Sequence, residues 1–340
     1  MSGLVELAAE YPTGRPTPQV TVLVVTYNSR RWFARQKAAL AAQSVQAFDL
    51  IVWDNGSDPG EAPRLDDLPS GARLVLCPDN LGFAAANNRA AALADTPFLA
   101  LLNPDAFPEA EWLEALLAAA SAHPQAAAFG STQLSAEDPS IFDGLGDAYL
   151  AIGAPWRGGY GQRRGAPRDG QTFSVCAAAA MVRTEAWRAA AGFDETLFSY
   201  GEDVDLCFRL RLMGWSVRQV AAARVTHVGG ASAGRRSPFA IYHGRRNRLW
   251  VFVKNMPLPL LAAMAPFHAA LTLCMWILSI GGPTFVPTNK AVMDGLAGLA
   301  AVWRRRREIQ QKRRASSAQI AQALCWNPMR ALRREPVLWG

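Results

Sequence analysis

The chain has 340 residues, of which 50% are hydrophobic and 19% are charged, so it can form one large domain or a domain with an appendage. Five widely spaced cysteines without a C-x-x-C pair argue against a disulfide framework or a zinc site and fit a reducing cytosol. From residue 241 onward there are 15 Lys and Arg against 3 Asp and Glu, and the preceding part has 20 against 25. No nucleic-acid recognition motif accompanies this basic tail, so we expect an anionic membrane surface, and no nucleic acid, as its partner.

The N-terminal residues 1–19 are polar and contain prolines. They include no apolar core of signal-peptide length, so we expect that the chain is not exported. We interpret this segment as a flexible arm that precedes the first folded element.

Residues 20–130 alternate between short apolar, β-branched runs and longer stretches of helical pattern. Such alternation implies βαβ units and a parallel sheet, so the predicted class is α/β. Because ligands of such sheets bind beyond the carboxyl ends of the strands, the residues that follow each strand are candidates for a site. Strands are predicted at 20–27, 49–54, 73–77 and 97–103, and helices at 31–42, 83–94 and 109–122.

Polar side chains follow three of the predicted strands. Each group is also ordinary turn chemistry, but three of them at one edge of a sheet point to a common crevice. Asp54 is suited to accept hydrogen bonds from a base or ribose, and Asp105 to hold a divalent cation that neutralises phosphates. The residues of this edge are Thr26, Tyr27, Asn28, Asp54, Asn103 and Asp105.

Neither G-x-G-x-x-G nor G-x-x-x-x-G-K-[ST] is present, which argues against a dinucleotide or a P-loop triphosphate as the ligand. The run from Asn80 through Gly82 predicts a turn that opens a helix, whose N-terminus favours an anion. A simple glycine-containing helix start explains the same run equally well.

Residues 131–172 are rich in Gly, Pro, Arg and Asp, and we interpret them as a long loop that serves as a flexible acceptor-side or lid segment. A buried strand is predicted at 172–182. The stretch SYGEDVDLCFRL, which follows at 199–210, places Glu202, Asp203 and Asp205 at the start of a predicted helix. These carboxylates either cap the helix and complement its dipole or form part of a catalytic site.

The ordered series VTYNS, DNGS, NLGFAAANNRA, LLNPDA, GFDETLFSYGEDVDLCFRL, HVGGAS and RRNRLW resembles the family 2 glycosyltransferases, in particular the bacterial rhamnosyltransferase-like group. The resemblance covers roughly residues 20–250. It implies a GT-A fold, which is a Rossmann-like, mostly parallel sheet with helices on both faces. Residues 20–130 would form the nucleotide-sugar-binding half and residues 131–250 the acceptor-binding half.

The resemblance also implies roles for individual residues. Asp203 would be the general base, and Asp54 would contact the nucleoside. Asp105 would occupy the metal-binding position of a D-x-D motif in which Asn103 replaces the first acid, and His227 would lie near the metal or the diphosphate. Asn80, Gly82 and Asn87 would join the sheet-edge residues in donor binding, and Glu202, Asp205 and Arg246 would support the site.

An inverting transfer needs a carboxylate to take the acceptor proton and a cation, Mg²⁺ or Mn²⁺, to stabilise the leaving diphosphate. The expected reaction moves L-rhamnose from dTDP-rhamnose to a cell-envelope glycan or a lipid-linked acceptor. A UDP-hexose or GDP-sugar donor on the same fold is the alternative. A third hypothesis is a catalytically inactive scaffold that binds sugar nucleotides. The presence of three matching aspartates argues against it.

Residues 251–340 are expected to form a helical tail that is both apolar and basic. The segment 257–282 has the length of a membrane span, but a single span would separate the cytosolic donor from the basic run Arg304–Arg307. An in-plane amphipathic helix or a re-entrant hairpin keeps both on one side, which predicts a cytoplasmic protein bound peripherally to the inner face of the cell membrane. A soluble appendage that packs on the catalytic domain or on a second subunit is the alternative, and a homo-oligomer stays open.

Overall fold

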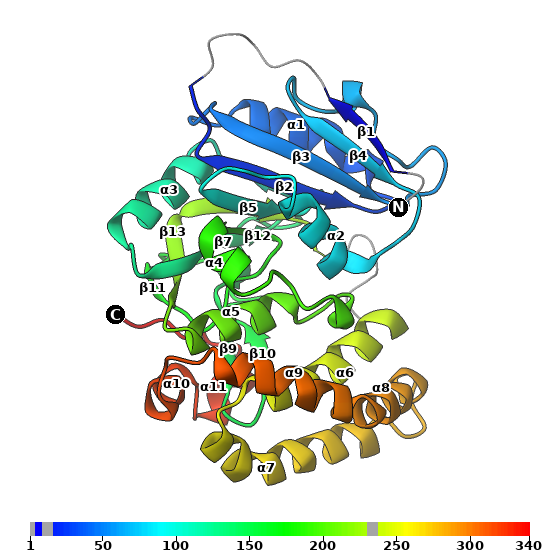
Figure 1. Cartoon of the computed structure of the whole chain (residues 1–340), viewed down its shortest axis with the longest axis vertical. Helices are drawn as coiled ribbons and strands as arrows, with labels where there is room; N and C mark the ends of the chain where they lie inside the picture. The colour runs from blue at the N-terminus through cyan, green and yellow to red at the C-terminus, as the bar shows by residue number, and fades with distance from the viewer. Residues whose placement is uncertain (1–3, 9–15, 230–236) are drawn as a thin grey trace.

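The computed structural model describes residues 4–8, 16–229 and 237–340 (Figure 1). Its centre is a sheet of eleven strands in the order β1-β4-β3-β2-β5-β12-β7-β13-β11, with β6 paired to β13 and β8 to β7. Figure 1 shows this sheet in the upper part of the view and the C-terminal helices in the lower part. The fold is therefore an α/β core joined to a helical C-terminal part.

The N-terminal half of the sheet is parallel and follows the predicted βαβ pattern. Strand β2 lies between β3 and β5, and β3 pairs with β4 on its other side. This confirms the strands and helices predicted between residues 20 and 122. The elements are β2 (Val20–Thr26), β3 (Phe48–Asn55), β4 (Arg73–Cys77) and β5 (Phe98–Leu102), with α1 (Phe33–Ala41), α2 (Gly82–Ala91) and α3 (Trp112–Ala122) between and after them.

The alternation of side chains along these strands divides the core into two apolar layers. Leu23 and Val25 pack with alanines of α2 on one face of the sheet, and Val22 and Val24 pack with residues of α1 and α3 on the other. The strands are apolar at nearly every position because helices cover both of their faces. Polar side chains are accordingly confined to the strand ends.

The second half of the sheet is mixed. Strand β12 (Ala179–Arg183) runs antiparallel to both β5 and β7 (Ala126–Ser135), whereas β13 (Ser216–His227) runs parallel to β7. The short strand β6 (Ala106–Pro108) pairs with the end of β13 and so brings the residues after β5 next to His227. The remaining elements of this half are β11 (Gly170–Gln171), α4 (Thr184–Ala189) and α5 (Glu202–Leu212).

The prediction of a long loop at 131–172 is wrong. Strand β7 continues to Ser135, and three further short strands follow it before β11. The glycines that suggested a loop stand at turns between these strands, with positive φ at Gly146, Gly153 and Gly159. The strand predicted at 172–182 begins only at Ala179, because residues before it run as irregular backbone. The three strands are β8 (Phe142–Leu145), β9 (Asp147–Leu150) and β10 (Ala154–Arg157), of which β9 and β10 form a separate pair.

Part of the predicted N-terminal arm is also a strand. Residues Val5–Ala8 form β1, which pairs antiparallel with the edge strand β4. An ion pair of 2.8 Å between Arg73 and Glu6 fixes this contact. Residues 1–3 and 9–15 of the arm lie outside the described residues.

Six helices form the C-terminal part, and α6 connects it to the sheet. Lys254 of α6 is buried and pairs with Asp194 and with Asp205 of α5. Among the described residues, α7 alone has the length and the mean hydropathy, 1.7, to cross a membrane, and most of its residues are exposed. The helices are α6 (Pro238–Asn255), α7 (Leu258–Ile277), α8 (Phe285–Ala297), α9 (Leu299–Gln311), α10 (Ser317–Ala323) and α11 (Pro328–Leu332). Single 3-10 turns lie at Arg30–Trp32, Leu65–Asp67 and Glu195–Leu197.

Candidate active site

A cavity of about 1210 Å³ lies beyond the carboxyl ends of β2, β3 and β5, between the sheet and helices α5, α6 and α7. Most of the residues predicted for a site line it, although they come from distant parts of the chain. These are Thr26, Tyr27, Asn80, Gly82, Asn103, Asp105, Glu202, Asp203 and His227. The predicted residues Asn28, Asp54, Asn87, Asp205 and Arg246 do not line it.

At the sheet end of the cavity, Asp54 lies just behind the wall. It is 3% exposed and accepts hydrogen bonds from the backbone N–H and the hydroxyl of Ser57, while burial raises its pKa. The next residue, Asn55, does line the cavity and donates to Asn80 at 3.0 Å. Asn55 therefore holds the turn at the start of α2.

Two other predicted residues at this end, Asn28 and Asn87, also do not line the cavity and make local contacts. The side chain of Asn28 bonds the backbone N–H and the carboxylate of Asp58, which ties the end of β2 to the loop after β3. Asn87 is buried inside α2 and donates to the carbonyl of Phe83. Both side chains thus support the wall from outside the cavity.

Gly82 brings the start of α2 into close contact with the loop that precedes α5. Its φ is +81°, and a Cβ at this position would lie 2.5 Å from the ring of Phe198. The N–H of Ala84 also donates to the carbonyl of Phe198 at 3.0 Å. The glycine is therefore required by both the backbone angle and the ring beside it.

Asp105 and His227 meet on another wall of the cavity. His227 Nε2 lies 3.5 Å from Asp105 Oδ1, and its Nδ1 lies 2.7 Å from Asp143 Oδ2. Burial would raise the pKa of Asp105, but its close contact with His227 and the charge of that ring outweigh burial and lower the pKa. Burial would lower the pKa of His227, but Asp105 and Asp143 raise it.

This pair fits a divalent cation. His227 Nε2 is buried and has no hydrogen-bond partner, and it faces Asp105 at the cavity wall, while Asp143 fixes the opposite ring nitrogen. A histidine oriented by a carboxylate in this way is the usual arrangement of a metal ligand. The described residues contain no group of three or more His, Cys, Asp or Glu suited to a metal, so phosphate and water oxygens would complete the coordination. Of the HVGGAS motif, residues 230–232 lie outside the described residues.

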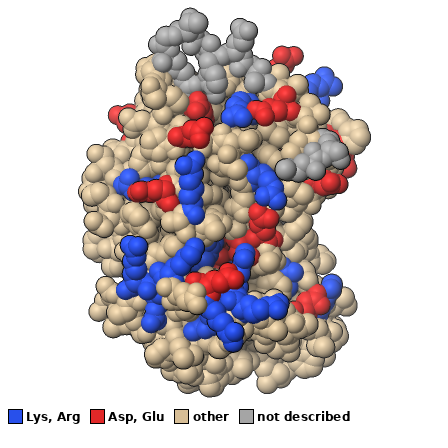
Figure 2. Space-filling view, in the orientation of Figure 1, with Lys and Arg blue, Asp and Glu red and all other residues tan. Residues whose placement is uncertain are grey.

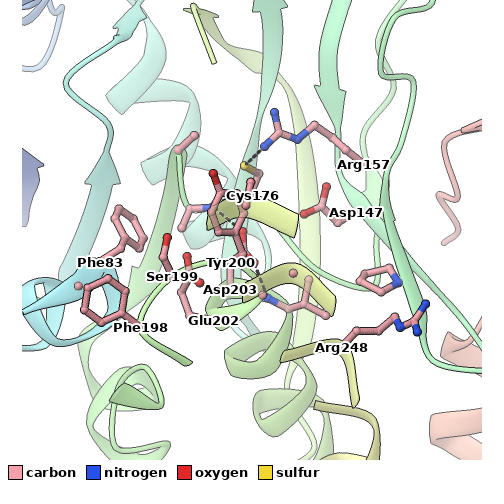
Figure 3. Close-up of a pocket in the computed structure, with 18 of the residues that line it drawn as sticks. Phe83, Asp147, Arg157, Cys176, Phe198, Ser199, Tyr200, Glu202, Asp203 and Arg248 are labelled. Atoms are coloured by element: carbon pink, nitrogen blue, oxygen red, sulfur yellow. Dashed lines mark hydrogen bonds between the residues drawn. The ribbon is translucent and has the colours of Figure 1, made fainter. Parts of the chain in front are cut away.

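Asp203 sits at the centre of the cavity, at the start of α5 (Figure 3). It is half-buried and accepts hydrogen bonds from the backbone N–H groups of Ala177, at 3.2 Å, and Val204, at 2.8 Å. Burial raises the pKa of Asp203. Burial and the charge of Asp203 together raise the pKa of the neighbouring Glu202 well above its ordinary value. The hydrogen bonds from Ala177 and Val204 oppose the rise in the pKa of Asp203.

A second polar cluster faces Asp203 from the region that was expected to be a loop. Arg157 donates to Asp143 at 2.7 Å and to the Cys176 sulfur at 3.0 Å. Asp147 is buried, and this burial together with the charge of Asp203 raises its pKa to about 8. Figure 3 shows Asp147 and Arg157 on one side of Asp203, and Phe83 and Phe198 on the other.

Asp205 and Arg246 belong to the joint behind the cavity. Asp205 is fully buried and pairs with Arg209 at 2.9 Å and with Lys254 at 2.8 Å, which ties α5 to α6. Arg246 donates to the backbone carbonyls of Thr196 and Leu197. Both contacts fix the loop and the helix that carry Asp203.

The chain is similar in sequence to known sugar-transferring enzymes. Residues 21–189 match the family model described as glycosyl transferase family 2. The chain is 30% identical over 243 residues to N-acetylglucosaminyl-diphospho-decaprenol L-rhamnosyltransferase of Mycobacterium tuberculosis, and the match covers 64% of this chain and 79% of the relative. The chain belongs to glycosyltransferase family 2. It is therefore a nucleotide-sugar-dependent glycosyltransferase.

Other comparisons agree with this assignment. The pre-mycofactocin glycosyltransferase of M. tuberculosis is 32% identical over 223 residues, which cover 64% of this chain and 44% of that protein. TarS of S. aureus has a TM-score of 0.53 at 15% identity, with 91% of this chain and 93% of that chain covered. A mannosyltransferase of Pyrobaculum calidifontis in complex with GDP-Man and Mn²⁺ has a TM-score of 0.52 at 16% identity, with coverage of 95% and 91%. The expected GT-A fold is confirmed.

The glycosyltransferase holds the loop before its candidate base in an uncommon backbone conformation. Phe198, Tyr200 and Gly201 all have positive φ, which is costly for the two aromatic residues. The buried side-chain amide of Asn247 on α6 donates to three carbonyls of this loop, those of Leu197, Ser199 and Tyr200, at 2.7–2.9 Å. Asn247 therefore positions Asp203 without lining the cavity.

We expect Asn247→Ala in this glycosyltransferase to lower the free energy of unfolding by about 1–3 kcal/mol, because it leaves buried carbonyls unpaired. The turnover number should fall further than this loss of stability explains, since the loop also sets the position of Asp203. Thermal unfolding and steady-state kinetics at a temperature where both proteins are folded would check this. Asn327→Ala removes only the N-terminal cap of α11, so it should leave the turnover number unchanged.

Sequence reasoning missed Asn55, Asp143, Asp147, Arg157 and Asn247. Asn55 stood next to a more familiar candidate, the aspartate of D-N-G. Asp143, Asp147 and Arg157 lay in the segment read as a loop, where alternating Phe142, Gly144 and Ala148 gave a weak strand signal. Asn247 lies in the RRNRLW motif, and only the fold shows that its amide reaches the loop of residues 197–200.

Proposed function

We propose that this enzyme transfers L-rhamnose, with inversion, from dTDP-rhamnose to a sugar held on a lipid diphosphate. The observation that carries this proposal is the single cavity in which Asp203 lies between the sheet edge, with Asp105 and His227, and the side chains of α6 and α7. A donor and an acceptor can thus approach Asp203 from opposite ends. The M. tuberculosis relative, whose name states both a rhamnosyl donor group and a diphospho-decaprenol acceptor, supports the choice of substrates.

Donor binding is assigned to the sheet end. Thr26, Tyr27, Asn80, Gly82 and Asn103 line this end and would contact the nucleotide sugar. The hydroxyl of Thr26 is buried without a hydrogen-bond partner, which suits a contact with a ligand. The residues behind the wall, Asn28, Asp54 and Asn87, would shape this end through the turns that they hold.

Asp203 would act as the base. Its carboxylate takes the proton of the acceptor hydroxyl while that oxygen attacks the anomeric carbon of the sugar. The bond from this carbon to the diphosphate oxygen breaks, and the nucleoside diphosphate leaves with the bonding electron pair. The configuration inverts because the attack and the departure occur on opposite faces of the sugar ring. The N–H groups of Ala177 and Val204 hold the carboxylate in place for this step.

Asp105 and His227 would hold Mg²⁺ or Mn²⁺ near the leaving group. A bound divalent cation supplies Lewis-acid stabilisation of the charge on the departing diphosphate. Asp143 would keep His227 in the orientation in which Nε2 faces the cavity. Glu202, Asp205 and Arg246 would support the helix start and the loop around Asp203 without contact to the reacting atoms.

The C-terminal region would hold the enzyme on the cytoplasmic face of the cell membrane. The apolar residues of α7 and α8 are exposed, with Phe267 at 57% and Val286 at 74%. Figure 2 shows Lys and Arg gathered across the lower half of the molecule and an uncharged surface at its lowest part, where α7 lies in Figure 1. An apolar surface edged by cations is suited to an anionic bilayer interface. In this proposal residues 20–250 form the catalytic region and residues 251–340 the tail, and α6 belongs to both.

The release of nucleoside diphosphate from a panel of donors tests the proposed function. The purified enzyme is incubated with dTDP-rhamnose, UDP-galactose, UDP-N-acetylglucosamine or GDP-mannose, with lipid extract and with Mg²⁺, Mn²⁺ or chelator. We expect selective, cation-dependent turnover of dTDP-rhamnose. Turnover of a UDP- or GDP-sugar instead would reassign the donor, and binding of a donor without any turnover on the full acceptor mixture would favour a scaffold.

A further inference from the structure

The far end of the cavity is lined by two arginines that have no acidic partner among the described residues. Arg245 and Arg248 both project from α6 into the cavity. Within the described part of the chain, no Asp or Glu lies at ion-pair distance from either guanidinium, whereas Arg157 in the same cavity pairs with Asp143. Two cations in one partly buried site, without an anion, are unfavourable unless a ligand supplies the negative charge.

Both arginines contact neutral groups, and the contacts of Arg248 are incomplete. Arg248 donates to the hydroxyl of Thr272 at 2.9 Å and to the sulfur of Met275, while its buried Nε has no hydrogen-bond partner. Arg245 donates to the carbonyl of Met275 at 3.3 Å and to the hydroxyl of Thr288. Burial, and for Arg248 also the nearby charge of Arg245, lowers both pKa values, that of Arg248 to about 10.

Other arginines without an acid partner are satisfied in a different way. Arg211 and Arg306 are buried, but their guanidinium groups donate to backbone carbonyls, and neither side chain lines the cavity. Tyr149, in contrast, lines the cavity and lies near enough to Arg248 to interact electrostatically with it. Its buried hydroxyl has no hydrogen-bond partner. Arg248 and Tyr149 therefore each leave a buried donor unpaired, and Arg245 lines the same cavity.

The wall beside these groups is apolar and leads to the exposed helix α7. Leu271 and Met275 of α7 line the cavity. Further around the same helix, Phe267, Leu273 and Ile277 are each more than half exposed. In Figure 3, Arg248 lies across Asp203 from Phe83 and Phe198, so this cation is on the side away from the start of α2.

We propose that Arg245 and Arg248 bind the diphosphate of the acceptor, and that the isoprenoid chain of the acceptor leaves past Leu271 and Met275 along α7. This assignment rests on the proposed function, since it requires an acceptor in which a sugar, a diphosphate and a lipid follow one another. The order of groups in such a molecule matches the order in the cavity, which runs from Asp203 to the arginines to the apolar helix. Two guanidinium groups suit a diphosphate because each donates two parallel hydrogen bonds to phosphate oxygens.

Kinetics with a charged and a neutral acceptor test the assignment. The charged acceptor is N-acetylglucosaminyl farnesyl diphosphate, and the neutral one is octyl N-acetylglucosaminide. We expect Arg245→Gln and Arg248→Gln each to raise the KM for the charged acceptor by about ten- to a hundred-fold, with the donor KM and the KM for the neutral acceptor unchanged. Arg248→Lys should recover part of the loss, because it restores the charge without the fork.

Arg188→Gln serves as the matched control, since it removes an exposed arginine of α4 outside the cavity and should change none of these constants. An equal rise in KM for both acceptors would show a structural role and overturn the assignment. If the wild-type enzyme used the neutral acceptor as well as the charged one, the lipid-diphosphate acceptor itself would be wrong. If the wild type prefers the charged acceptor and both variants keep this preference, the assignment of the arginines would be wrong but the proposed acceptor would stand.

Two binding measurements separate the possible sources of the phosphate. With the nucleotide site saturated by dTDP and Mn²⁺, farnesyl diphosphate should bind the wild type at least about ten-fold more tightly than Arg248→Gln, as measured by calorimetry. Farnesol should bind both proteins weakly and equally. Phosphatidylglycerol vesicles should bind the wild type and both variants alike. Loss of vesicle binding without loss of farnesyl diphosphate binding would assign the arginines to bulk lipid headgroups and overturn the proposal.

Discussion

Asp203→Asn is expected to reduce kcat by about 10²–10⁴, which is the usual contribution of a positioned general base. Asparagine keeps the size of the side chain, and its single carbonyl oxygen can still accept from one of the two N–H groups, that of Ala177 or that of Val204, so the start of α5 should change little. It cannot accept the proton of the acceptor hydroxyl. Affinity for the nucleotide should therefore be retained, as calorimetry with dTDP would show.

The pH profile gives a second readout for Asp203. Burial raises its pKa above the ordinary value of 3.8, so the carboxylate becomes protonated, and inactive as a base, as the pH falls through that raised pKa. The wild type should lose kcat/KM on this acidic limb and recover it at higher pH, and the residual activity of Asp203→Asn should lack the limb. Glu202→Gln is the matched comparison, because burial and the charge of Asp203 raise the pKa of Glu202 and so favour the neutral form that glutamine resembles. Its effect should be much smaller. A residual rate in Asp203→Asn close to that of the wild type would move the role of base to another group, of which Asp147 in the same cavity is a candidate.

Asp105→Asn is expected to lower kcat/KM by roughly 10²–10³ at ordinary cation concentrations, because a Lewis acid at the leaving group contributes several kcal/mol. The substitution removes a negative ligand opposite His227 Nε2 and weakens cation binding. Raising the Mn²⁺ concentration should recover part of the rate. Excess chelator should abolish the activity of the wild type.

Two further variants sharpen this test. Asp143→Asn leaves both proposed ligands in place but loosens the orientation of His227, so it should weaken cation affinity by about 10–100-fold. Asp95→Asn removes a fully exposed carboxylate and should leave the cation requirement unchanged. Full activity of the wild type in excess chelator would refute the proposed role of Asp105 and His227.

The sequence predicted the nucleotide-binding half of the fold well because its signals are local. Strands β2 to β5 are apolar runs buried on both faces, and the helices between them repeat with a clear period, so neighbouring residues suffice to identify them. The prediction for residues 131–172 was wrong because the signals there are not local. The strands of this region are short, and some pair with segments distant in the sequence, as Leu150 does with Cys325 and β11 with β13. The glycines of this region indicate turns whether or not strands lie between them.

The sequence by itself determined the α/β class, the strand-end position of Asp105 and the crowding of acids at residues 202–205. Only the tertiary structure decided what each acid does. Asp203 and Asp205 are two residues apart, which is about 200° around a helix, so they point to different faces of α5. The packing of α5 turns Asp203 toward the cavity and buries Asp205 against Lys254 of α6. A local pattern fixes which residues share a helix, whereas contacts between distant segments fix which face of that helix meets the substrate.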